Sequence, residues 1–133
     1  MATINEVFYN HLKNSSTMQT EFTGGVHYVV NDDKAKEPYA VVWLSEDNQD
    51  IVNLCIVDQG EASFACEVYS KTYTKGVNKR KAFQDVCREL EATITYNINV
   101  WKVSIQAVSD RSVRIDGLFS FTFEAVLSWE LDT

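Results

Sequence analysis

The histidines and cysteines of this sequence are the side chains best suited to nucleophilic or metal chemistry, and their spacing argues against both. His11 and His27 have no Cys, Asp or Glu at the separations typical of zinc ligands. Three cysteines, Cys55, Cys66 and Cys87, are widely spaced and form no C-x-x-C. We therefore expect no catalytic residue and no metal site, and we interpret the cysteines as small core residues.

Motifs that bind phosphates or activate a serine are also missing from the sequence. It contains no G-x-S-x-G, no P-loop and no G-x-G-x-x-G. Two acidic pairs, Asp32-Asp33 and Glu46-Asp47, lie in polar runs without the apolar surroundings that would raise the pKa of a general acid. The sequence thus predicts a protein that is not an enzyme and needs no cofactor.

Charge limits the partners of this chain. The formal net charge is −7, from 12 basic and 19 acidic residues. Such a balance argues against tight wrapping of nucleic acid, which requires Lys and Arg to neutralise phosphates. An acidic surface also suits a place where DNA passes closely without binding, so the charge alone leaves that role and plain solubility open.

One basic cluster interrupts the acidic sequence. Five of the 12 basic residues fall within residues 71–81, namely Lys71, Lys75, Lys79, Arg80 and Lys81. They predict either a docking patch or a solvated start of a helix. Because opposite patches on one chain suit a head-to-tail contact, we hypothesise that Lys79, Arg80 and Lys81 meet an acidic run on a neighbouring copy. The candidate acids are Asp32, Asp33, Glu46, Asp47 and Asp50.

Hydrophobic periodicity predicts two helices and several strands. A helix should begin near Thr3, which forms a capping box with Glu6, and a second should span about 76–93. Strands are expected at 26–30, 39–44, 51–57, 61–73, 101–107 and 119–131, the last alternating without a break. Residues 31–37 and 45–50 should be polar loops, 59–60 a turn, and 109–117 a turn or long hairpin tip.

This order of elements predicts an α+β fold. We expect a mainly antiparallel sheet of about five to six strands with two helices packed on one face, in a single domain spanning residues 1–133. The sequence has no apolar run long enough for a membrane span and no signal peptide at its start, so we expect synthesis in the cytoplasm and no membrane partner.

The chain resembles the tail terminator and tail completion proteins of long-tailed bacteriophages over nearly its whole length. The resemblance rests on short motifs in a fixed order: Gly24-Gly25-Val26-His27-Tyr28, Pro38-Tyr39-Ala40-Val41-Val42, Glu67-Val68-Tyr69-Ser70, the apolar helical set Phe83, Val86, Cys87 and Leu90, and Asp116-Gly117-Leu118-Phe119. Family members often carry a basic and then an aliphatic residue where Val26 and His27 stand here.

The resemblance implies a virion protein that acts by shape. Its subunits would form a hexameric ring that caps the tail tube, stops tube polymerisation and docks to the head connector, while DNA passes through the lumen without specific binding. Residues 45–50 and 109–117 would be the contact elements, with Arg111 and Arg114 meeting acidic neighbours. Two other functions stay open: a small module that binds a peptide at a sheet edge, and an enzyme whose cleft is scattered through the sequence.

Overall fold

The computed structural model describes residues 3–28, 36–53, 56–115 and 117–132, with side chains placed except at 46–53, 56–58, 107 and 109–115. Three helices and six strands follow one another along the chain. They are α1 (Ile4–Asn14), α2 (Ser16–Glu21), β1 (Val26–Tyr28), β2 (Tyr39–Asn53), β3 (Ile56–Ser70), α3 (Tyr73–Arg88), β4 (Thr93–Thr95), β5 (Ile98–Ile115) and β6 (Leu118–Leu131).

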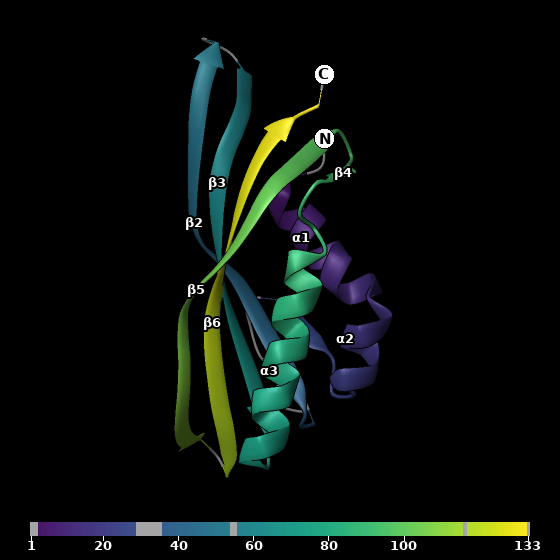
Figure 1. Ribbon diagram of the computed structural model, residues 1–133, viewed down its shortest axis with the longest axis vertical. Helices are drawn as coiled ribbons and strands as arrows, with labels where there is room; N and C mark the ends of the chain where they lie inside the picture. The colour runs from purple at the N-terminus through teal and green to yellow at the C-terminus, as the bar shows by residue number, and fades with distance from the viewer. Residues whose placement is uncertain (1–2, 29–35, 54–55, 116, 133) are drawn as a thin grey trace.

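All six strands belong to one sheet, in the order β1-β2-β3-β6-β5-β4. The short β1 pairs with β2 in parallel, and every other pair is antiparallel. The sheet is long and twisted, and the three helices lie together on one side of it (Figure 1). The predicted α+β class and strand number are confirmed, while the helices number three rather than two.

The core lies between the helices and the sheet. The alternating residues of β6 and β3 that face the helices are buried, among them Phe64, Phe121 and Phe123. The predicted first helix is confirmed, because Ile4, Val7, Phe8 and Leu12 are its buried residues. The Thr3 side chain accepts a hydrogen bond from the Glu6 N–H at 3.2 Å, which confirms the predicted N-cap.

The second predicted helix, over 76–93, is misplaced at both ends. Helix α3 runs from Tyr73 to Arg88 with Thr72 as its N-cap, and β4 follows at Thr93–Thr95, so that Ile94 is 55% exposed and not on a buried helical face. The unpredicted helix α2 is capped by Ser15, whose hydroxyl accepts a hydrogen bond from the Met18 N–H at 3.3 Å. The Ser15 cap starts a separate helix in a segment where the spacing of apolar residues did not predict one.

The predicted loop at 45–50 and the predicted turn at 59–60 are wrong, because their residues continue strands. Residues 45–50 belong to β2, and the predicted turn at 59–60 lies within β3. Residues 109–115 belong to β5, which pairs with β6 up to Ile115 and Leu118, and Gly117 has φ +79°. This agrees with the predicted long hairpin tip at 109–117. The polar sequence of residues 45–50 lacks the alternation of apolar and polar residues that predicts a strand. The predicted loop at 31–37 falls mostly outside the described residues.

Cys66 and Cys87 are buried in the core, as predicted, and Cys55 lies outside the described residues. Burial raises the pKa of the Cys66 thiol well above its ordinary value, and a hydrogen bond with Cys87 raises it further. Since the thiolate is the reactive form, we expect iodoacetamide at pH 8 to label both positions far more slowly in the native protein than in urea. Peptide-resolved mass spectrometry measures this, and equal labelling in both states would contradict it.

Candidate functional site

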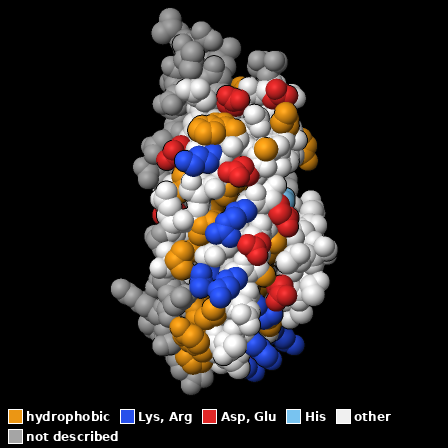
Figure 2. All heavy atoms as spheres, viewed as in Figure 1, with side chains coloured by type: hydrophobic (Ala, Val, Ile, Leu, Met, Phe, Trp, Pro, Cys, Tyr) orange, Lys and Arg blue, Asp and Glu red, His pale blue; other side chains and the backbone are white. Residues whose placement is uncertain are grey.

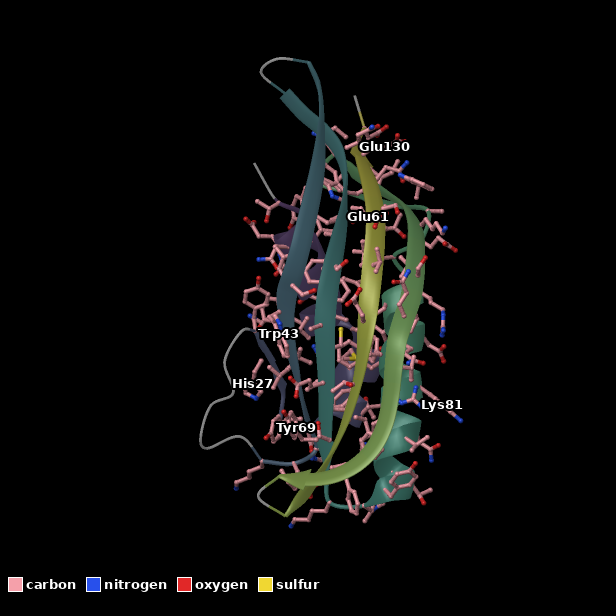
Figure 3. All side chains as sticks on the ribbon, turned by 90° about the vertical axis from the view of Figure 1, so that its left-hand side faces the viewer. His27, Trp43, Glu61, Tyr69, Lys81 and Glu130 are labelled. Atoms are coloured by element: carbon pink, nitrogen blue, oxygen red, sulfur yellow. The ribbon has the colours of Figure 1, made fainter. Side chains whose placement is uncertain are left out.

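The side of the sheet opposite the helices is an open face that carries acidic and aromatic residues. Strand partners place Glu61 and Glu67 of β3 on this face with Glu124 and Glu130 of β6. Lys102 of β5, the register partner of Ser128, is exposed on the same face. Figure 3 shows Glu61, Glu130, Trp43 and Tyr69 along this surface. The described part of the open face is therefore predominantly acidic.

Aromatic side chains cover the end of the open face near β1. Tyr39 and Tyr69 stack at a centroid distance of 4.8 Å, and His27 meets Tyr39 edge-on at 6.0 Å. The Tyr69 hydroxyl donates a hydrogen bond to Glu67 Oε2. Partial burial, and next this bond to an anion, raise the pKa of Tyr69 above its ordinary value, so the phenol stays protonated and remains a donor. This cluster stiffens the face and offers no activated nucleophile.

The acidic and arginine residues predicted as contacts lie on the long strands β2 and β5, each next to a short outermost strand of the sheet. Glu46, Asp47 and Asp50 lie on β2, which pairs with β1 only from Ala40 to Val42. Arg111 and Arg114 lie on β5, which pairs with β4 only from Ile98 to Val100. The remainder of each strand has no further strand beside it among the described residues. The side chains at these five positions are outside the described part.

The three basic residues predicted as one contact patch have different surroundings. Lys79 Nζ donates to the Glu21 carbonyl at 2.7 Å and forms an ion pair with Glu21 Oε2 at 3.1 Å. Arg80 is 6% exposed, on the buried side of α3, whereas Lys81 is exposed. Figure 2 shows basic and acidic side chains interspersed along this side of the molecule. Only Lys81 of the three is available to a partner in this conformation.

Lys79 should therefore matter more for stability than for binding. We expect Lys79→Met to lower the free energy of unfolding by about 1–2 kcal/mol, because the carbonyl at the end of α2 loses a charged donor. The matched variant Lys81→Met should change it by less than about 0.5 kcal/mol. Urea denaturation followed by circular dichroism measures both, and equal effects of the two variants would contradict the assignment.

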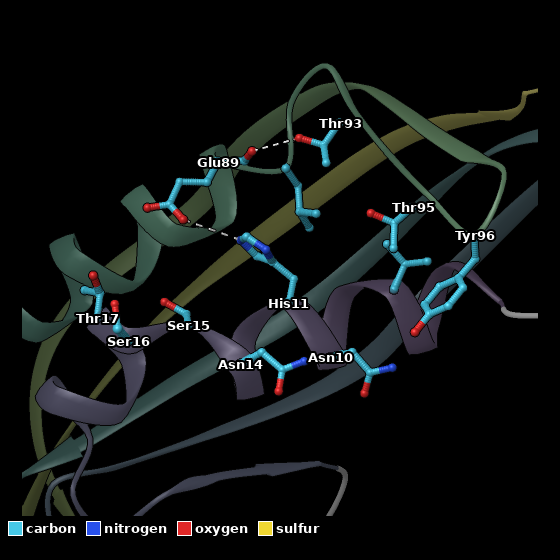
Figure 4. Close-up of a pocket in the computed structure, with 12 residues that line it drawn as sticks. Asn10, His11, Asn14, Ser15, Ser16, Thr17, Glu89, Thr93, Thr95 and Tyr96 are labelled. Atoms are coloured by element: carbon cyan, nitrogen blue, oxygen red, sulfur yellow. Dashed lines mark hydrogen bonds and ion pairs between the residues drawn. The ribbon is translucent and has the colours of Figure 1, made fainter.

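An open cleft of about 470 Å³ lies between α1, the end of α3 and β4 (Figure 4). His11 is at its centre. Its Nε2 donates to the Val86 carbonyl at 2.7 Å and lies 3.8 Å from Glu89 Oε2. The hydroxyl of Ser15 caps α2, and that of Thr93 donates to the Glu89 carbonyl at 3.1 Å. These hydrogen bonds tie the ends of the helices together.

Other site types can be assessed only over the described residues. Within that part of the chain, no group of three or more His, Cys, Asp or Glu side chains is arranged to hold a metal ion. None of the described helices has the length and hydropathy to cross a membrane.

Sequence reasoning missed two residues at the free margin of β5. Lys102 is exposed beside a register shift in β5, and Glu91 Oε1 accepts a hydrogen bond from the Val103 backbone N–H at 3.2 Å. Lys102 lies next to the 53% exposed Trp101. In the sequence, the only sign of this margin is a basic residue next to an aromatic one, Trp101-Lys102. The contact of Glu91 with Val103 depends on the tertiary structure.

Comparison with known proteins gives a structural likeness without a sequence match. No protein-family model matches the chain, and no curated protein matches it. Its fold is similar to that of a chain in the solved structure of the virion of a native gene transfer agent particle, with a TM-score of 0.64 and 12% identity over 92% of this chain and 91% of that one. A second solved chain aligns over 93% of this chain and 86% of its own at 16% identity, with a TM-score of only 0.44. The first likeness establishes a shared fold.

Proposed function

We propose that this chain is a virion structural protein of a tailed phage or phage-like particle. Within it, the chain acts as a tail terminator or tail completion subunit that rings the head-proximal end of the tail tube, stops tube polymerisation and docks to the head connector. The observation that carries the proposal is the fold likeness to a chain of a gene transfer agent virion, which spans more than nine tenths of both chains. The order of the sequence motifs supports the same family.

The proposal gives the open face of the sheet a role. In a ring with the helices outside, this face lines the lumen, where Glu61, Glu67, Glu124 and Glu130 repel phosphates. DNA then passes without specific binding. The helices, which bury the other face of the sheet, form the outer layer (Figure 1).

The two ends of the sheet suit contacts along the ring axis. The end of β2 beside the start of β3 and the end of β5 beside the start of β6 lie at opposite ends of the molecule (Figure 1). The sequence at each of these ends is rich in polar residues, which fits one end for the tail tube and the other for the head connector. The mechanism is one of shape and charge, and the proposal includes no catalytic step.

Self-association tests the proposal. Sedimentation velocity of the purified chain over a wide range of concentration, alone and with tail tube protein, should show a discrete closed oligomer, the hexamer being our expectation. A monomer at every concentration, with and without tube protein, would rule out the ring.

A peptide-binding module is the second candidate, because the margins of β2 and β5 can accept an added strand. Such a protein would remain a monomer and bind an extended peptide with saturation. The same sedimentation experiment separates the two functions.

A further inference from the structure

Among the described residues, β2 and β5 each have a backbone margin without a strand beside it, on opposite sides of the sheet. Along β2 the margin covers residues 43–53, beyond the segment that β1 pairs with. Along β5 it covers residues 101–115, beyond the segment that β4 pairs with. We call these the β2 edge and the β5 edge. Unpaired strand edges of this length are templates for pairing with another strand.

The two edges overlap at the same level of the sheet. Trp43 pairs with Ala65, Ala65 pairs with Glu124, and Glu124 pairs with Gln106. Trp43 and Gln106 therefore lie at the same height across the sheet. Asn48 is level with Lys102 through Glu61 and Ser128. Residues 43–48 and 102–106 therefore lie at equal height on opposite sides of the sheet. Among the described residues, neither segment has a further strand beside it. A neighbour rotated about an axis along the strands, without any shift along it, would bring one segment beside the other.

Strand direction also matches. Three successive antiparallel pairs separate β2 from β5, so the two strands run in opposite directions. Rotation about an axis along the strands preserves direction, and the β5 edge of a neighbour would therefore meet the β2 edge as an antiparallel partner. The alternation of directions in the sheet would continue across the contact.

Charge distinguishes the two edges. The β2 edge contains Glu46, Asp47 and Asp50 and no basic residue. The β5 edge contains Lys102, Arg111 and Arg114 against one acid, Asp110. Lys102 is level with Asn48, and residues 46 and 50 lie two positions to either side of Asn48 along β2, which is the diagonal distance that long side chains span. Identical edges would repel each other, whereas unlike edges attract.

The β5 edge is capped in the isolated chain. Val103 donates its outward N–H to Glu91 Oε1 at 3.2 Å, and Glu91 is exposed. The carboxylate occupies the place that a carbonyl of an added strand would take. An edge protected by an exposed charged side chain is open to a partner that displaces it.

We propose that the β2 edge of one copy pairs antiparallel with the β5 edge of the next, so that the sheets continue around the ring. This inference rests on the proposed function and names its subunit interface. The contact joins different surfaces of the two copies, as a head-to-tail ring requires.

Cysteine cross-linking tests the pairing directly. In a background with Cys55→Ser, the double variant Asn48→Cys/Lys102→Cys should form a ladder of covalent multimers under mild oxidation with diamide. Each single variant should give dimers at most. The control Asn48→Cys/Lys81→Cys places the second thiol on α3 and should give no ladder. Circular dichroism establishes that each variant is folded.

Charge exchange supplies an independent test. Lys102→Glu should weaken association about tenfold, since one attractive contact is replaced by repulsion from the acids of β2. Glu46→Lys combined with Lys102→Glu should recover most of that loss, because position 46 shares the face of Asn48 and Lys102. Glu91→Ala should strengthen association by uncapping the β5 edge. Sedimentation velocity gives the association constants.

The outcomes separate this inference from the proposed function. A closed oligomer that forms normally but gives no ladder and ignores both charge variants would overturn the edge pairing while leaving the ring intact. A chain that never associates would overturn both. Saturable binding of an added peptide to a monomer, lost in the Asn48→Pro variant, would assign the β2 edge to a different partner and also overturn the inference.

Discussion

Replacing Phe64 with Ala should lower the free energy of unfolding by about 3–5 kcal/mol, the largest loss expected from a single substitution here. Phe64 is fully buried and stacks on Phe8 of α1 at a centroid distance of 4.1 Å. Its ring thus joins the first helix to β3 at the centre of the sheet, and removing it leaves a cavity that neither backbone can close.

Urea denaturation at a protein concentration below assembly measures this loss. Trp101→Ala is the matched control, because Trp101 is also a strand aromatic but is 53% exposed. We expect a change of less than about 1 kcal/mol for the control. Similar losses for the two variants would show that the Phe8–Phe64 contact is not central to the core.

The second large effect is a loss of stability on replacing a helical glycine, Gly76, with alanine, a change that usually stabilises a helix. Gly76 lies in α3, where Gly→Ala normally stabilises by about 1 kcal/mol. A Cβ at Gly76 would overlap the ring of Phe121, which is fully buried. We expect Gly76→Ala to destabilise the protein by about 1–3 kcal/mol, because the helix must move away from the sheet.

A double-mutant cycle isolates the cause. Phe121→Leu makes room above Gly76, so the pair Gly76→Ala/Phe121→Leu should lose less stability than the sum of the single variants. The exposed helical variant Asn78→Ala should be neutral or slightly stabilising. Additive losses in the cycle would mean that the backbone of α3, rather than the Phe121 ring, limits position 76.

The core could be predicted from the sequence because elements that bury one face have apolar residues at regular intervals. Helix α1 and strand β6 each bury one face, and their apolar residues recur at the corresponding period. The cap at Thr3 was also visible, since capping depends on residues three positions apart. These local rules gave the α+β class and most of the elements.

The outer parts of the sheet could not be predicted in the same way. Residues 45–50 and 109–115 are strands held by backbone pairing to β3 and β6, and that pairing leaves no pattern in their side chains. The burial of Arg80 was missed because a long cationic side chain is normally solvated. Composition therefore identified the charged residues 46, 47, 50, 111 and 114, but only the strand order places them on two free edges.

That placement revises how copies of the chain would meet. The sequence favoured contacts between polar loops and a basic patch on a helix. In the structure, the predicted contact residues 46, 47, 50, 111 and 114 lie on extended strands, where backbone hydrogen bonds to a partner strand would add to charge attraction. The lysine of α3 expected at the interface, Lys79, instead binds Glu21 of its own chain.

Electron microscopy of tail tubes assembled with and without this chain tests the central claim most directly. If the chain is a tail terminator, added protein should form a ring of density at one end of each tube, and those tubes should stop lengthening. Tubes that keep growing with bare ends in the presence of excess folded chain would contradict the proposed function.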